Sequence, residues 1–298
     1  MSEESATAAY QVTLLGEAGE AEAIASRLEE TIEPRALAVS LFDRGMGRFE
    51  VSALYAERPH EDALVAALDG AAHGAVSIEP LAAADWVTLS QGKRGPVQAG
   101  RFLAHGSHDR DRVPKRRLAI EIDAGQAFGT AHHASTRGCL LALDDLLKRE
   151  RPRVILDVGT GTGILAIAAA KVLQCPVLAS DEDRLAAAIA AANARKNRAG
   201  ALISTVTARG FAHPSLRRLA ADLLLANLVE RALYALAPEL ARRVKPGGTA
   251  ILSGLTQTQA RTIEARNSAF GFILEKRIVL DGWTTLMLRR RKGRAVGD

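Results

Sequence analysis

The chain has 298 residues, about twice the usual length of one domain, so it is expected to form roughly two domains. Apolar residues make up 48% of it and the formal net charge is +5, as in a globular protein with a modest basic excess. Every apolar run is shorter than the ~18 residues that a membrane-spanning helix needs. The acidic, polar start lacks the features of a secretory signal. These features exclude a membrane protein and indicate a cytoplasmic one.

The cysteines and the basic clusters point away from metal and nucleic-acid chemistry. Cys139 and Cys175 lie far apart without paired spacing, so neither a disulfide nor a zinc cage is expected. The basic clusters at 115–117 and 289–292 are interpreted as solvated ends. No aromatic residues alternate with them to stack on bases. The sequence therefore predicts no direct readout of nucleic acid.

The first part of the chain alternates between strand-like and helix-like patterns. Strands are predicted at 10–15, 36–42, 49–55 and 75–78, and helices at 20–30 and 60–68. The order βαββαβ is that of a ferredoxin-like α+β domain, which we assign to residues 1–84. Residues 85–117 are rich in glycine, proline and charge, and are interpreted as a connecting region.

From residue 153 onward strands and helices alternate in the manner of α/β proteins. Strands are predicted at 153–156, 177–179, 202–206, 223–226 and 249–253, and helices at 164–173, 184–197 and 231–244. The end of the chain differs, because residues 272–280 and 283–288 flank Asp281-Gly282, which is typical of an antiparallel hairpin. The pattern predicts a parallel sheet finished by a hairpin.

The strongest local motif is a glycine-rich turn between the first of these strands and its helix. It runs from Val154 to Ile164 and contains Asp157, Gly159, Gly161 and Gly163. Glycine tolerates positive φ in a tight turn and lets a ligand lie against the backbone at the end of the strand. A dinucleotide fingerprint would need glycine where Ile164 stands, and the Gly-Lys-Ser/Thr of a phosphate-binding loop is absent. Both nucleotide-binding interpretations are therefore disfavoured.

Two polar residues are predicted to reach the same edge of the sheet. Asp181 ends the next strand, where its carboxylate can accept hydrogen bonds from the ribose hydroxyls of an adenosyl group. Asp183 is predicted instead to cap the following helix. Asn227 ends a later strand, and its amide can hold a neutral amine with the lone pair facing an electrophilic methyl. An ordinary turn asparagine is the alternative for Asn227.

Residues 123–140 are rich in small and hydroxyl-bearing side chains, which suit a close-fitting loop over a ligand. His132 and His133 lie within this segment, and His105 and His108 precede it. Neither pair is accompanied by further ligands at recognisable spacing, so no metal site is expected.

Together these motifs resemble the PrmA family, the methyltransferases of ribosomal protein L11. The matching residues are Ala127–Thr130 with His133, Ser135 and Thr136; Leu156–Ala168; Ala226-Asn227; and the landmarks Asp85–Val87, Lys245–Gly248 and Leu252–Leu255. The resemblance extends over nearly the whole chain, and its front part matches the family's substrate-recognition domain. It departs at Ala131 and Ser135, where the family usually has glycine and threonine, and in Leu228–Arg231.

The resemblance implies a Rossmann-like class I methyltransferase domain over residues 118–298, with a mostly parallel seven-stranded sheet and a terminal hairpin. It implies S-adenosyl-L-methionine as the cofactor and Asn227 and Thr130 as catalytic residues. The cofactor contacts that it implies are Phe128, Gly129, Thr136, Asp157, Gly159, Gly161, Gly163, Asp181 and Asn227. The expected substrate is ribosomal protein L11, free or on the large ribosomal subunit, methylated on lysine ε-amino or α-amino groups by a monomeric enzyme.

Three alternatives stay open at this point. A class I methyltransferase acting on another protein or on a small molecule would share every cofactor feature. A nicotinamide oxidoreductase would use a similar sheet, although the glycine spacing and the terminal hairpin argue against it. A non-enzymatic ribosome- or RNA-binding protein would exploit the basic ends of the chain.

Overall fold

The computed structural model describes residues 7–30, 36, 38–45, 48–68, 76–82, 95–114, 118–123 and 133–292. The chain divides into two compact units, Met1–Gly92 and Lys93–Asp298, and each is described by itself. Within the described ranges, no helix is long and apolar enough to cross a membrane.

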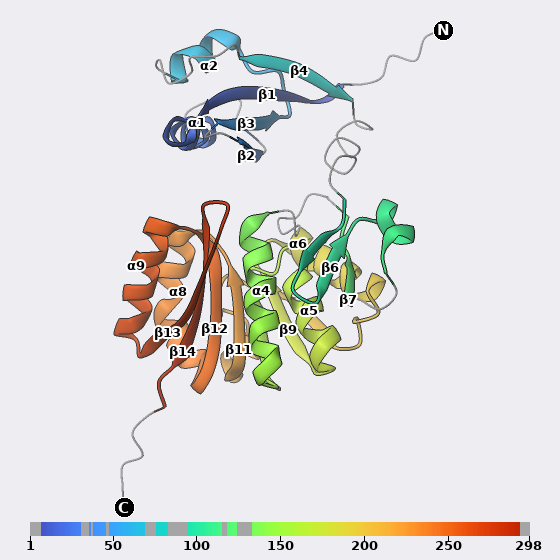
Figure 1. The fold of residues 1–298 in the computed structure, drawn as a ribbon, viewed down its shortest axis with the longest axis vertical. Coiled ribbons are helices and arrows are strands. Elements are labelled where there is room, and N and C mark those ends of the chain that lie inside the picture. The colour runs from blue at the N-terminus through green and yellow to red at the C-terminus, as the bar shows by residue number, and fades with distance from the viewer. Residues whose placement is uncertain are drawn as a thin grey trace, which may run out of the picture. The chain divides into compact units, whose positions relative to one another are not determined.

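The first unit has the element order that the sequence predicts. Its elements are β1 (Thr7–Glu17), α1 (Ala18–Glu30), β2 (Ala38–Gly45), β3 (Arg48–Tyr55), α2 (Glu61–Leu68) and β4 (Ser77–Ala82). The strands form an antiparallel sheet in the order β2-β3-β1-β4 (Figure 1). Alternate residues of β1 and β3, such as Val12 and Val51, are buried with Ile24 of α1 and Leu64 of α2. Both helices therefore share one face of this sheet.

The second unit is built on a sheet of seven strands. They are β8 (Ile155–Val158), β9 (Val177–Asp181), β10 (Ile203–Thr207), β11 (Ala221–Asn227), β12 (Val244–Thr256), β13 (Phe272–Leu280) and β14 (Trp283–Arg290). Their order is β10-β9-β8-β11-β12-β14-β13. The first five run parallel, and β14 pairs antiparallel with both β12 and β13. The mostly parallel sheet with a terminal hairpin is therefore confirmed.

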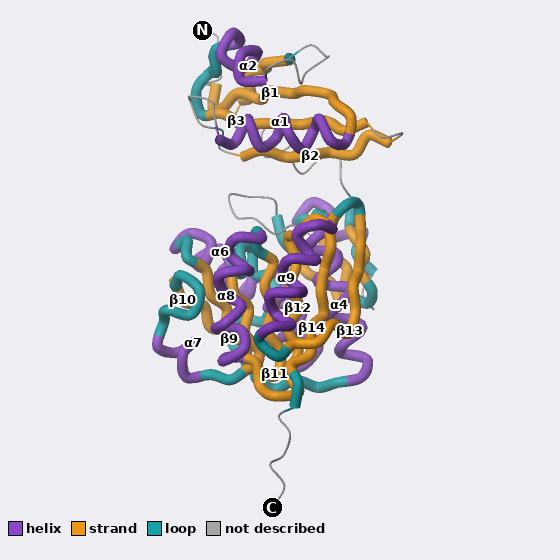
Figure 2. The backbone as a smooth tube through the Cα atoms, turned by 90° about the vertical axis from the view of Figure 1, so that its left-hand side faces the viewer, coloured by secondary structure: helices purple, strands orange, loops and turns teal. Residues whose placement is uncertain are grey.

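Helices cover both faces of this sheet (Figures 1 and 2). They are α4 (Ala134–Arg149), α5 (Ile164–Leu173), α6 (Arg184–Lys196), the short α7 (Pro214–Arg218), α8 (Glu230–Arg243) and α9 (Gln257–Ala269). Along β11, Leu223 and Leu225 belong to the core shared with α4 and α5, whereas Leu224 and Ala226 belong to the core shared with α8 and α9. The continuous apolar runs of the strands are explained by this burial on both faces.

The stretch predicted as a connecting region contains secondary structure. β5 (Val97–Ala99), β6 (Phe102–His105) and a 3-10 helix at Ser107–Arg112 fall within it, and β6 pairs parallel with β7 (Leu118–Glu121). Phe102 is fully buried in the core that contains α4. Strands this short carry too little periodicity to be predicted from the sequence. Of that stretch, residues 85–94 and 115–117 are outside the described residues.

Candidate active site

Three of the predicted site residues meet at the carboxyl edge of the second unit's sheet. β8 lies between β9 and β11 and runs parallel to both. Asp157 pairs with Leu225 on one side and with Ala179 on the other. Asp181 and Asn227 end their strands two residues beyond those partners. The chain direction of the strands thus brings the three polar side chains to one edge.

The glycine-rich turn follows β8 and joins this edge to α5. Gly159, Gly161 and Gly163 have φ values of 71°, 53° and 83°, in the left-handed region that favours glycine. Gly159 N donates a hydrogen bond of 2.8 Å to the carbonyl oxygen of Ser180 at the end of β9. A Cβ at Gly159 would lie 2.2 Å from Cδ2 of Leu228. The positive φ therefore favours glycine at position 159, and any larger residue would also have to displace the end of the Leu228 side chain.

Asp157 is a buried carboxylate beneath the turn. Its Oδ2 accepts hydrogen bonds from Thr160 Oγ1 at 2.6 Å and from Ala166 N at 3.1 Å. Its Oδ1 is buried and has no hydrogen-bond partner among the described residues. Burial raises the pKa of this carboxyl to about 6, and the two hydrogen bonds oppose the rise. A buried acceptor without a partner is costly, so Asp157 suits a donor or a positive charge brought by a ligand.

Asp181 is held against the turn by the backbone. Its Oδ2 accepts a hydrogen bond of 2.9 Å from Gly161 N, and its Oδ1 accepts one of 3.1 Å from Asp183 N. A carboxylate has about four acceptor positions, so these contacts orient Asp181 and leave capacity for ligand hydroxyls. The side chain of Asp183 accepts a hydrogen bond of 2.8 Å from Leu185 N, which confirms its prediction as the cap of α6.

Asn227 contacts the first turn of α4, which is distant in the sequence. Its Nδ2 donates a hydrogen bond of 3.2 Å to Oγ1 of Thr136, a side chain only 1% exposed. The other amide atom of Asn227, Oδ1, is buried without a hydrogen-bond partner in the described part of the chain. The contact with Thr136 therefore fixes the amide with its acceptor unused. This is the arrangement that an amine N–H donor requires.

His133 begins α4 as its cap. Its Nδ1 accepts a hydrogen bond of 3.3 Å from Ser135 N, and its ring packs edge-on against Trp283 with centroids 4.7 Å apart. Burial lowers the pKa of this imidazole. Within the described ranges, no three His, Cys, Asp or Glu side chains come together as metal ligands.

The predictions for Phe128, Gly129 and Thr130 fall on residues 124–132, which are outside the described residues. The same holds for His132 and for Ala131, one of the positions that departs from the family pattern.

A buried hydroxyl pair behind the site was not predicted. Ser253 lies beside Asn227 in the pairing of β11 with β12. Its Oγ lies 2.7 Å from Oγ1 of Thr285 and 3.3 Å from each of the carbonyl oxygens of Ser135 and Thr284, and its single hydrogen can be donated to one of these oxygens. This contact ties the first turn of α4, which carries Thr136, to the sheet. The only sign of this pair in the sequence is that Ser253 and Thr285 are hydroxyl residues inside otherwise apolar strands.

Comparisons with known proteins match one family over nearly the whole chain. The family described as ribosomal protein L11 methyltransferase (PrmA) matches residues 3–291. The ribosomal protein L11 methyltransferase of Rhodopseudomonas palustris (strain BisB5) is 44% identical over 282 residues, covering 93% of this chain and 96% of that protein. The ribosomal protein L11 methyltransferase of Mesorhizobium japonicum is 42% identical over 277 residues, covering 91% of this chain and 95% of that protein.

A solved structure supports the same fold. The crystal structure of ribosomal protein L11 methylase from Lactobacillus delbrueckii subsp. bulgaricus superposes with a TM-score of 0.60 at 28% identity. It covers 66% of this chain and 100% of that chain. The second unit thus has the α/β fold of methyltransferases.

Proposed function

The chain belongs to the ribosomal protein L11 methyltransferase (PrmA) family, and from that premise we propose that it transfers methyl groups from S-adenosyl-L-methionine to amino groups of ribosomal protein L11. The substrate class follows from the names of the relatives. The observation that carries the chemistry is a pair of buried acceptors on the neighbouring strands β8 and β11, Oδ1 of Asp157 and Oδ1 of Asn227, which have no hydrogen-bond partner among the described residues.

The residues at this edge fit the cofactor. Gly159 and Gly161 of the turn are half-buried and carry no side chain that would keep a ligand away from the backbone. Asp181, held in place by Gly161 N, would accept hydrogen bonds from the ribose hydroxyls. The unused oxygen of Asp157 would face a positively charged group, which the ammonium and sulfonium of the cofactor provide. Phe128, Gly129 and Thr130 complete the proposed contacts from the family resemblance. When bound, the cofactor supplies an electrophilic methyl group.

Asn227 holds the nucleophile in this proposal. Its Oδ1 accepts a hydrogen bond from the substrate amine, while Thr136 keeps the amide from rotating. A lysine with its ordinary pKa of about 10.4 must lose a proton before it can attack. Desolvation at the edge and the adjacent positive charge both lower that pKa. Positioning then accounts for most of the acceleration, and no strong general base is required.

The first unit is proposed to recognise the protein substrate. We assign residues 1–84 to a ferredoxin-like domain because the βαββαβ order and the antiparallel strand order β4-β1-β3-β2 are those of that fold. Residues 85–117 are proposed as the connection, of which β5 and β6 pack into the core of the second unit, and residues 118–298 as the methyltransferase domain. The proposal further places a monomeric enzyme in the cytoplasm, acting on L11 either free or on the large ribosomal subunit.

The proposal is tested with purified full-length protein, isotope-labelled methyl donor and purified L11, followed by mass spectrometry of L11. We expect labelled methyl groups on L11 amines, and we expect Asn227→Ala to lower turnover at least about tenfold while the melting temperature changes little. Gln257→Ala is the matched control, because it removes an exposed amide that has no hydrogen bond to described residues. Failure of the wild type to label L11, or normal turnover in Asn227→Ala, would contradict the proposal.

A further inference from the structure

The opposite end of the second unit's sheet carries most of the chain's basic excess. Four segments reach this end, and we call them together the basic edge: residues 149–153, 214–222, 239–248 and 287–292. They contain twelve Lys and Arg residues and three Asp and Glu residues, a net charge of +9, whereas the whole chain has +5. The rest of the chain is therefore net acidic.

The four segments form one continuous surface. Arg243 donates a hydrogen bond to the carbonyl oxygen of Arg217, which joins the end of α8 to α7. Arg290 donates one to the carbonyl oxygen of Val244, which joins β14 to the start of β12. Lys245 Nζ lies 2.7 Å from Oδ1 of Asp222. The segments lie at the amino ends of β8, β11 and β12, so the basic edge faces away from the candidate active site.

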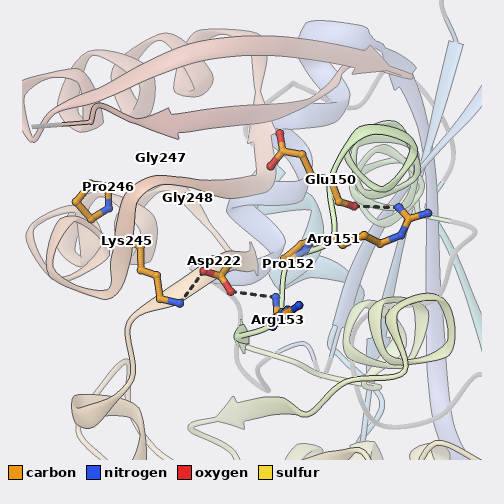
Figure 3. A pocket seen from close by; sticks show the side chains of 9 residues that line it. All are labelled: Glu150, Arg151, Pro152, Arg153, Asp222, Lys245, Pro246, Gly247 and Gly248. Atoms are coloured by element: carbon orange, nitrogen blue, oxygen red, sulfur yellow. Dashed lines mark hydrogen bonds and ion pairs between the residues drawn. The ribbon is translucent and has the colours of Figure 1, made fainter.

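A pocket lies at the centre of the basic edge, and its acidic side chains are already engaged. Residues 150–153, Asp222 and residues 245–248 line it (Figure 3). Asp222 Oδ2 accepts hydrogen bonds of 2.9 Å from Arg153 N and from Val154 N, and Glu150 is paired with Arg289. These two carboxylates therefore neutralise Lys245 and Arg289, and neither forms an ion pair with the side chains of Arg151 or Arg153, which also line the pocket.

Several basic side chains of this surface have no partner among the residues that the structure describes. Arg153, Arg218 and Lys292 are exposed, and the structure gives their side chains no hydrogen bond or ion pair with any described residue. Unpaired cations on one surface repel one another, and their summed positive potential attracts a polyanion to that surface.

The composition of the surface indicates the chemistry of its partner. Ten of its twelve basic residues are arginines, whose planar guanidinium groups match phosphate oxygens in pairs. None of the large apolar side chains exposed in the described part of the chain lies in these four segments. Insertion into a membrane and stacking on bases therefore have no support.

We propose that the basic edge binds the phosphate backbone of RNA without reading its sequence. RNA supplies closely spaced negative charges, and each phosphate that the protein neutralises releases counterions. This binding goes beyond the proposed methyl transfer and uses the opposite edge of the sheet. It leaves the candidate active site open while RNA is bound.

The test measures binding of the full-length protein to a fluorescent RNA duplex of about 20 base pairs across a range of salt concentrations. The variant Arg153→Gln/Arg218→Gln removes two unpaired cations of the basic edge. The control Arg184→Gln/Arg261→Gln removes two exposed arginines near the starts of α6 and α9, with the same change in net charge. We expect the first variant to bind about tenfold more weakly at low salt, with a log–log salt slope about one to two units smaller, and the control to bind as the wild type does. Melting curves establish that both variants are folded.

Three results would overturn the proposal. The first is wild-type binding to the duplex that is undetectable at low salt or insensitive to salt. The second is an equal loss of affinity in the test and control variants, which would indicate a diffuse charge effect. The third is equally tight binding of poly-L-glutamate of the same total charge, which would identify an acidic protein surface as the partner. None of these results depends on methyl transfer, so the two proposals fail separately.

Discussion

The buried carboxyl of Asp157 leads to a quantitative expectation for stability. Its pKa rises from the ordinary value of 3.8 to about 6 because burial disfavours the charged form. In the unfolded chain the carboxyl is hydrated and titrates near its ordinary value. Between these two pKa values the folded protein binds more protons than the unfolded chain does. The stability that Asp157 contributes is therefore complete below about pH 4 and is lost as the pH rises through about 6.

The expected magnitude follows from the separation of the two pKa values. At about 1.4 kcal/mol per pKa unit, the full loss is about 3 kcal/mol, and roughly half of it falls between pH 5 and pH 8. Asp157→Asn keeps an oxygen acceptor for Thr160 and Ala166 but has no charge to desolvate. Between pH 5 and pH 8, the free energy of unfolding of the variant should therefore rise by about 1 kcal/mol relative to that of the wild type.

The assay is urea unfolding of both proteins at pH 5, 6, 7 and 8, followed by circular dichroism without cofactor. Comparison of the two proteins at each pH removes the effect of titrating groups that do not interact with Asp157. Asp181 also raises the pKa of Asp157 through its charge, so Asp181→Asn should reduce the pH dependence of the wild-type sequence. A stability difference between wild type and Asp157→Asn that stays constant from pH 5 to pH 8 would refute the reasoning.

Three further outcomes are expected. Asp181→Ala should weaken S-adenosylmethionine binding by about 1.5–3 kcal/mol in calorimetry, because charge-assisted hydrogen bonds to the ribose are lost; unchanged affinity would remove Asp181 from the site. Gly159→Ala should lower the free energy of unfolding by roughly 1–3 kcal/mol in urea denaturation. Adding Leu228→Ala to Gly159→Ala should restore only the part of the free energy of unfolding that is lost through the contact with Cδ2 of Leu228, and not the part that is lost through the positive φ. Full restoration of the free energy of unfolding would exclude backbone strain. A fragment beginning at Lys93 should fold and bind the cofactor within about tenfold of the full-length affinity, but methylate L11 far more slowly. A fragment beginning at Leu118 should be less stable, because it lacks the buried Phe102. Full-rate methylation by the folded Lys93 fragment would exclude recognition by the first unit.

Local features of the second unit could be predicted from the sequence because they depend on short-range sterics. Glycine at position 159 indicates a backbone conformation that other residues avoid. Asp183 indicates the start of a helix, because its side chain accepts a hydrogen bond from one of the helix's unpaired N–H groups. Asp181 and Asn227 could be placed at one edge because parallel strands end on the same side of a sheet. The strands β5 and β6 could not be predicted, because three or four residues hold no measurable periodicity.

The sequence by itself determined the order of the elements, the glycine-rich turn and the family resemblance. Only the tertiary structure decided which side chains touch across long separations. Thr136 and Asn227 are 91 residues apart, and their hydrogen bond exists because α4 packs across β11 and β12. In the same way, residues 289–292 look like a solvated end in the sequence, and they belong to a large basic surface only once β14 pairs with β12. Local conformation follows from each residue's own backbone and neighbours, whereas charge density and burial depend on the sheet order that brings distant segments together.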